Sequence, residues 1–227
     1  MNTDQSVSAV PIAPGVGAIT AGIGLLVMAV IAPLAVFGVI DPIVVAGDPV
    51  ATAANVTEGI TAVRLATVGL VVVLFLDVIV AWGLYGVFYA VNPGVSLLGA
   101  WFRLIYTAVF AVAIANLVGV PLAAARVAAG DAGHVLYLIS AYHQTWQAAL
   151  VLFGVHLGII GGLAWRSRFV PRILAALIVV AGVGYVVDGV ALLLNPAFPV
   201  QIATFTFVGE VLFIFWLLTA GRKLRAR

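Results

Sequence analysis

Two apolar segments meet at a short basic hinge in the sequence FGVHLGIIGGLAWRSRFVPRILAALIVVAGVGYVVDG, which runs from Phe153 to Gly189. The hinge holds Arg166, Arg168 and Arg172. Each segment can supply a helix that crosses a hydrocarbon core, for which about 20 mainly apolar residues are needed. The stretch therefore predicts two transmembrane helices joined by a turn whose positive charges stay on the cytoplasmic side.

The composition of the whole chain agrees with a membrane protein. Of its 227 residues, 65% are hydrophobic and 8% are charged, whereas soluble domains carry about 25% charged residues. A soluble globule could not be covered with so few polar groups, so we expect the lipid bilayer to be the solvent. The formal net charge is +2, but the basic residues lie at predicted helix ends and form no patch of the kind that binds nucleic acid. There is no cysteine, which excludes disulfides and thiolate-bound metals.

We expect an all-α, polytopic membrane protein with six transmembrane helices in one bundle. The predicted spans cover about residues 15–40, 64–91, 96–120, 143–165, 172–194 and 200–219. They form one transmembrane domain, 15–221, between an N-terminal tail, 1–14, and a basic C-terminal tail, 222–227.

The connections between these spans are short. Asp48 followed by proline predicts the start of a small interfacial helix over residues 49–58, with the aspartate as its N-cap. The sequence Asn-Pro-Gly at 92–94 predicts a tight turn. We expect Pro121 to mark the end of the third span, and residues 126–137 to form a polar connection, with His134 in a loop.

The distribution of basic residues predicts the orientation. Four of them follow the last span, Arg222, Lys223, Arg225 and Arg227, and three more lie in the hinge. Lysine and arginine in short loops are retained on the cytoplasmic side. We therefore expect both termini in the cytoplasm, the acidic loop around Asp48 outside, and a multi-pass protein of the cell membrane.

Five ionisable residues fall inside predicted spans, where a charge costs at least about 2.5–3.5 kcal/mol and indicates a functional site by default. They are Asp77, Arg103, His156, Asp188 and Glu210. At about 1.5 Å per helical residue, they lie roughly 10–24 Å from the cytoplasmic boundary. An arginine side chain is long enough for Arg103 to meet Asp77 or Glu210.

A purely structural interpretation of these groups is open. A buried pair of Arg103 with a carboxylate can hold helices in register, and His156 can be a hydrogen-bonded packing residue. Tyr185 shares a helix face with Asp188, so its hydroxyl can satisfy that carboxylate. The secondary candidates Arg64 and His143 fall near the outer boundary, where they can act as interfacial anchors.

The functional interpretation is transport or sensing of a small solute or a proton. A surplus carboxylate beside a histidine can carry protons or bind a cation, and Asp188 would continue the path outward. Six spans also make the second half of the chain inverted relative to the first, as in many transporters. In that arrangement Asp77 corresponds to Asp188, and Arg103 to Glu210.

Two other classes of function remain open. One is an intramembrane enzyme acting at the same carboxylates and histidine. No catalytic residue, metal site or cofactor is predicted for it, because His143 and His156 lie about 140° apart around one helix. The other is a non-catalytic subunit that binds a membrane-protein partner or a second copy of itself. A glycine stripe of Gly154, Gly158 and Gly162, from which His156 points away, would be its contact surface.

The order and spacing of these residues resemble a known family over most of the chain. The residues that carry the resemblance are Gly47-Asp48, Thr52-Ala53-Ala54-Asn55, Arg64, Asp77, Tyr85, Arg103, His143, Phe153-Gly154-Val155-His156, Ser167, Pro171-Arg172, Gly184-Tyr185, Asp188, Gly209-Glu210 and Trp216. Together they resemble the bacterial and archaeal membrane proteins called domain of unknown function 4386. The resemblance implies a six-span fold in a prokaryotic cytoplasmic membrane, and it brings no reaction.

Overall fold

The computed structural model describes residues 12–126, 132–195 and 202–225, and these form helices and short connections without any strand. Six helical segments are long and apolar enough to cross a membrane. They are Pro14–Ile40, Ile60–Phe88, Pro93–Ala124, Ala132–Ser167, Arg172–Leu194 and Ala203–Lys223. The predicted all-α architecture with six spans is therefore confirmed, and the chain is a multi-pass membrane protein.

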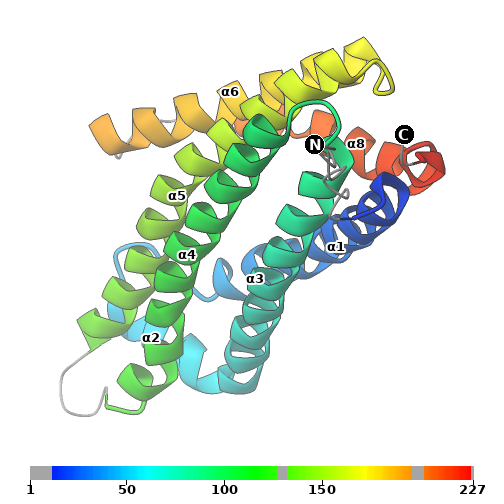
Figure 1. The fold of residues 1–227 in the computed structure, drawn as a ribbon. Helices are drawn as coiled ribbons and strands as arrows, with labels where there is room; N and C mark the ends of the chain where they lie inside the picture. Colours follow the sequence, from blue (N-terminus) through cyan, green and yellow to red (C-terminus); the bar gives the residue numbers. More distant parts are fainter. Residues whose placement is uncertain (1–11, 127–131, 196–201, 226–227) are drawn as a thin grey trace, which may run out of the picture.

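The spanning helices form a closed ring (Figure 1). Its members are α1 (Pro14–Ala35), α3 (Ile60–Phe88), α4 (Pro93–Ala124), α5 (Ala132–Ser167), α6 (Arg172–Leu194) and α8 (Val208–Thr219). Each packs against the next in this order, and α8 returns to α1. Side chains from distant parts of the chain therefore meet inside the ring.

Four segments gather at one end of the ring. The start of α1 lies against the C-terminal segment, since a Cβ on Gly15 would lie 2.7 Å from the carbonyl oxygen of Arg222. In the hinge before α6, the ring of Phe169 stacks on Phe88 at the end of α3, with centroids 6.1 Å apart. It also stacks on Trp216 of α8 at 6.2 Å. A chain that crosses the membrane six times must begin its first span and end its last span on the same side, and the structure agrees with this. That this side faces the cytoplasm stays a prediction.

The opposite end is covered by α2 (Pro49–Glu58), which contacts α3, α4 and α5. Its predicted N-cap is confirmed, because the Asp48 side chain accepts a hydrogen bond of 2.9 Å from the N–H of Ala51. Thr52 and Val56 on α2 are fully buried. The helix is thus packed into the bundle and does not merely lie at its surface.

Several predicted helix boundaries were wrong. The α5 helix begins at Ala132, so His134 lies on a helix and only residues 127–131 of the expected connection fall outside the described residues. The α4 helix continues past Pro121 to Ala124, and the N–H of Ala125 donates to the Pro121 carbonyl at 3.2 Å. A proline inside a helix removes one hydrogen bond and strains the preceding turn, but it does not have to end the helix. The 36 residues of α5 span about 54 Å, which is longer than the roughly 30 Å hydrocarbon core of a bilayer. Hydropathy marks only the part of a helix that lies in lipid, so it did not predict the ends of α5.

The last span is interrupted. The first two residues of the predicted span, 200–201, lie outside the described residues. The chain then forms a short helix, α7 (Ala203–Thr206), and continues as α8 after a break at Phe207. A 3₁₀ turn, η3 (Gly221–Lys223), follows. The first span likewise ends in a π-helical turn, η1 (Val36–Ile40), a few residues after Pro33.

The predicted glycine stripe was only partly right. A Cβ on Gly154 would lie 2.5 Å from the carbonyl oxygen of Gly182, so α5 and α6 touch backbone to backbone there. The second close approach is at Gly161, where a Cβ would lie 3.1 Å from the carbonyl oxygen of Ala175. Gly158 and Gly162 have no neighbouring atom within 4 Å of an added Cβ. Residues that are four or seven apart lie on roughly the same face of a helix, so spacing alone could not distinguish Gly158 from Gly161. The position of α6 decides which of these glycines it covers.

Candidate functional site

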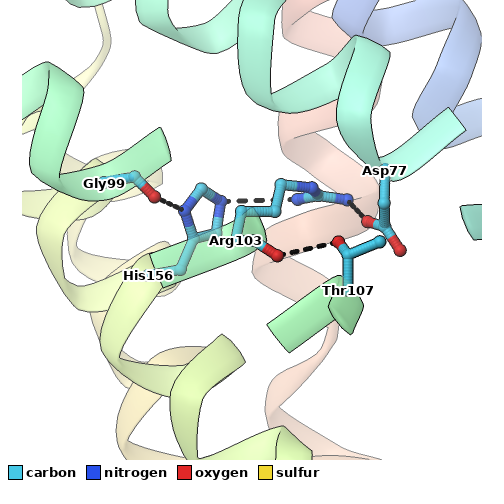
Figure 2. A network of polar contacts seen from close by, with 5 residues as sticks. All are labelled: Asp77, Gly99, Arg103, Thr107 and His156. Atoms are coloured by element: carbon cyan, nitrogen blue, oxygen red, sulfur yellow. Dashed lines mark hydrogen bonds and ion pairs between the residues drawn. The ribbon is translucent and has the colours of Figure 1, made fainter. Parts of the chain in front are cut away.

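A buried ion pair joins α3 to α4 inside the ring. Arg103 Nη2 lies 2.6 Å from Asp77 Oδ1, and the two side chains are 2% and 0% exposed. Figure 2 shows the guanidinium extended between α3 and α5. The side chain of Arg103 was predicted to be long enough to reach Asp77 or Glu210, and the structure pairs it with Asp77.

His156 of α5 contacts the other side of the same guanidinium. Its Nδ1 lies 2.8 Å from the carbonyl oxygen of Gly99, which only accepts hydrogen bonds, so Nδ1 carries the proton. Its Nε2 lies 3.4 Å from Arg103 Nη1, which only donates, so Nε2 is the acceptor. Both contacts together specify the neutral imidazole with the proton on Nδ1 (Figure 2).

Three further residues shape the surroundings of Arg103: Phe153, Thr107 and, through its bond to His156, Gly99. The ring of Phe153 lies under the guanidinium, 5.4 Å from its carbon, at a distance typical of a cation–π contact. Thr107 donates a 2.8 Å hydrogen bond to the Arg103 carbonyl and so closes a helical turn below it. The sequence held a signal for two of them, since Thr107 follows Arg103 by four residues and Phe153 precedes His156 by three. A backbone acceptor such as the Gly99 carbonyl leaves no such signal.

Glu210 of α8 adds a second carboxylate to this region. Its Oε1 is buried and has no hydrogen-bond partner. Arg103 and the hydroxyl of Tyr185 are its electrostatic neighbours. Nε of Arg103 and Oδ2 of Asp77 are buried without a hydrogen bond as well. Arg103 therefore pairs with one carboxylate and lies within electrostatic range of a second one on a different helix. Several polar atoms around it have no hydrogen-bond partner.

Asp188 does not join this cluster. Its two carboxylate oxygens accept hydrogen bonds from the backbone N–H groups of Ile202 at 2.8 Å and Ala203 at 2.6 Å. It therefore caps the start of α7, where helical N–H groups lack partners in the helix. The expected bond between Tyr185 and Asp188 was wrong, since the tyrosine hydroxyl lies beside Glu210.

A line of aromatic side chains runs from the cluster toward the end covered by α2. The ring of Tyr106 lies 5.0 Å from Phe153 and 5.9 Å from Phe110, and Phe110 lies 6.0 Å from Trp146. Trp146 in turn stacks on Tyr142 at 6.0 Å. The Tyr142 hydroxyl and the Trp146 indole nitrogen are buried without hydrogen-bond partners. Sequence reasoning missed this line, because aromatic residues at helical spacing usually belong to an apolar core.

The line ends at a second, partly exposed pair. The ring of Tyr142 touches that of His143, and His143 Nε2 lies 3.3 Å from Asp41 Oδ1. Burial raises the pKa of the Asp41 carboxyl, and the neighbouring His143 acts in the opposite direction. Arg64 lies apart from both groups, exposed near the start of α3.

A metal centre of the usual kind is not seen in the part of the chain that the structure describes. No three histidine, aspartate or glutamate side chains converge there as ligands could. The chemistry that the cluster can perform with its own groups is ion pairing, hydrogen bonding and proton exchange.

Comparisons with known proteins place this arrangement in a family. Residues 20–221 match the family described as Domain of unknown function (DUF4386). The chain belongs to this family. An uncharacterised protein of Archaeoglobus fulgidus is 34% identical over 157 residues, which cover 69% of this chain and 84% of that protein. No solved structure matches. In this DUF4386 protein, the whole cluster around Arg103 lies within the matched residues.

Proposed function

We propose that this protein moves protons, or a small solute coupled to them, across the cell membrane through the cluster of Asp77, Arg103, His156 and Glu210. The observation that carries the proposal is a surplus of buried carboxylate: Arg103 pairs with Asp77, while Glu210, an electrostatic neighbour of Arg103, has an unpartnered carboxylate oxygen. Buried charges of this kind in a membrane protein mark ion pathways and proton relays by default.

The charge balance supports proton exchange at Glu210 and Asp77. Arg103 supplies one positive charge, and His156 is neutral because its two nitrogens serve an acceptor and a donor. One guanidinium can compensate one carboxylate. The other carboxylate is stable in an apolar interior only with a proton or a bound cation.

Exchange of partners by Arg103 would couple this proton to a movement of helices. Asp77 belongs to α3 and Glu210 to α8, and these two helices are not neighbours in the ring. Protonation of Asp77 would release Arg103 to Glu210 and so favour a different arrangement of α3 relative to α8. Two discrete states of this kind are what alternating access requires.

The aromatic line supports an access route from the end covered by α2. Tyr106 is an electrostatic neighbour of Asp77, and Tyr142 is one of Asp41. Tyrosine hydroxyls both donate and accept hydrogen bonds, so with water between them they can pass a proton. The His143–Asp41 pair would then be the entrance.

The test is proton flux into liposomes that contain the purified protein and a pH-sensitive dye. We expect a pH jump to be dissipated by the native protein, and Asp77→Asn and Glu210→Gln to reduce the flux to that of empty liposomes. Glu58→Gln removes an exposed carboxylate on α2 and should leave the flux unchanged. Retained flux in both cluster variants, with native folding shown by circular dichroism, would refute the proposal.

A further inference from the structure

A groove of about 580 Å³ lies between α3 and α4, near the start of α3 and the end of α4. The buried side chains of Leu117 and Thr67 form its floor. Its walls are Val68, Val118 and Leu122, whose exposed fractions of 59%, 64% and 59% place them toward the lipid. Apolar walls of this kind suit an acyl chain and provide few hydrogen-bond partners for a polar solute.

Arg64 lines the same groove and supplies its charge. The two ion pairs among the described residues are Arg103 with Asp77 and His143 with Asp41, so Arg64 has no carboxylate partner there. The hydroxyl of Thr67, the other polar side chain of the groove, is already bonded to the Val63 carbonyl at 2.8 Å. An exposed guanidinium without a counter-ion, next to apolar walls, is complementary to an anionic group that carries a hydrocarbon chain.

We infer that this groove binds one anionic phospholipid, with its phosphate at Arg64 and an acyl chain between α3 and α4. Arg64 lies in the second turn of a spanning helix, near the depth where phosphates of a leaflet lie when the hydrocarbon part of that helix is in the core. Arg126, which directly follows the groove residue Ala125, adds positive charge to the same end. This inference is independent of the proposed transport function.

The test is lipid binding to the detergent-purified protein, measured by native mass spectrometry with dioleoylphosphatidylglycerol and dioleoylphosphatidylcholine. One arginine near an anionic lipid contributes about a fivefold preference. We therefore expect the native protein to bind the first phosphatidylglycerol about fivefold more tightly than the first phosphatidylcholine. Arg64→Gln should lower this preference to about the small contribution of the nearby Arg126.

Two further variants separate the groove from general charge attraction. Arg166→Gln removes the same charge from the hinge at the other end of the bundle and should keep the preference. Val118→Trp fills the groove from an exposed position and should weaken binding of both lipids. Millimolar inorganic phosphate should not displace the bound lipid, because it lacks the acyl chain.

Any of three results would overturn the inference: no preference in the native protein, an unchanged preference in Arg64→Gln, or an equal loss in Arg166→Gln. Displacement by inorganic phosphate would show a simple anion site instead. Since Arg64 and Val118 are both exposed, these variants are expected to fold, and unchanged circular dichroism would establish it.

Discussion

Arg103 is almost completely buried, with 1% of its surface exposed, so its contacts are made by the protein itself. Asp77 compensates its charge, His156 accepts from one Nη, and Phe153 covers its face. Removing one member of a buried ion pair costs about 3–5 kcal/mol, mostly because the other charge is left uncompensated, whereas removing both members can be nearly neutral. The pair can therefore contribute much to specificity and little to net stability.

Arg103→Leu should lower the free energy of unfolding by about 3–5 kcal/mol. The double variant Asp77→Leu with Arg103→Leu should be clearly more stable than Arg103→Leu alone, because the Asp77 carboxylate is no longer left without its partner. Reversible unfolding in mixed micelles measures both, with Arg166→Leu at the exposed hinge as the control. A double variant at least as unstable as the single one would mean that the pair is not coupled as the geometry indicates.

The tautomer of His156 gives a second prediction at this scale. A glutamine at this position can donate to the Gly99 carbonyl and accept from Arg103, as the neutral imidazole does. His156→Leu should therefore destabilise the protein by about 1–3 kcal/mol, and His156→Gln by clearly less. Nitrogen-15 NMR of labelled histidine should show the proton on Nδ1; a proton on Nε2 would contradict the assigned contacts.

Among the elements, the interrupted last span depends on a side chain from its neighbour. The first N–H groups of a helix have no partner within it, and in a bilayer each unsatisfied group is costly. Asp188 of α6 accepts from two of them at the start of α7. It is thus a structural residue that also fixes where α7 lies against α6.

Replacing Asp188 by leucine should remove about 2 kcal/mol of local stability. Asparagine keeps one acceptor oxygen and should retain part of it. Hydrogen exchange of the backbone amides of 202–206 is the direct measurement, and we expect faster exchange there in Asp188→Leu, with the amides of α4 unaffected. Unchanged exchange at 202–206 would show that the cap contributes nothing.

The contact between α5 and α6 distinguishes glycines that look alike in sequence. Gly154→Ala would place a methyl group 2.5 Å from the carbonyl oxygen of Gly182, so the backbones must separate, at a cost of about 1–3 kcal/mol. Gly158→Ala meets open space and should be neutral or stabilising by up to about 1 kcal/mol, because alanine favours the helix. Unfolding of the two variants side by side checks this, and equal effects would argue against the position of α6.

At the scale of the whole molecule, the ring brings one ionisable residue from each of α3, α4, α5 and α8 into one region. Closure of the ring through α8 and α1 also puts the start of α1 and the segment after α8 on the same side, as the contact of Gly15 with Arg222 shows. Which side this is follows only from the basic residues, and it can be measured directly.

The chain has no cysteine, so single cysteines report topology without background. We expect Lys223→Cys in intact cells to be shielded from a membrane-impermeant maleimide and Glu58→Cys to be labelled. Both positions are exposed in the structure. Labelling of Lys223→Cys from outside would reverse the orientation, although the six-span fold would stand.

The number of spans, the helix α2 with its Asp48 cap, and the start of α6 at Arg172 followed from the sequence, because hydropathy, capping residues and helix-breaking turns act locally. The length of Arg103 also allowed the contact with Asp77 to be anticipated. The ends of α4 and α5 could not be read in this way, because a helix continues beyond the bilayer wherever packing and hydrogen bonds support it.

The partners of the buried groups were decided by the tertiary structure. Asp188 and Glu210 are both carboxylates inside apolar segments, yet one caps α7 and the other lies beside Tyr185 and Arg103. The Gly99 carbonyl and the buried groups of Tyr142 and Trp146 gave no signal in sequence. A side chain's partner depends on how helices are rotated and which helix lies opposite, and these are properties of the closed ring rather than of any single segment.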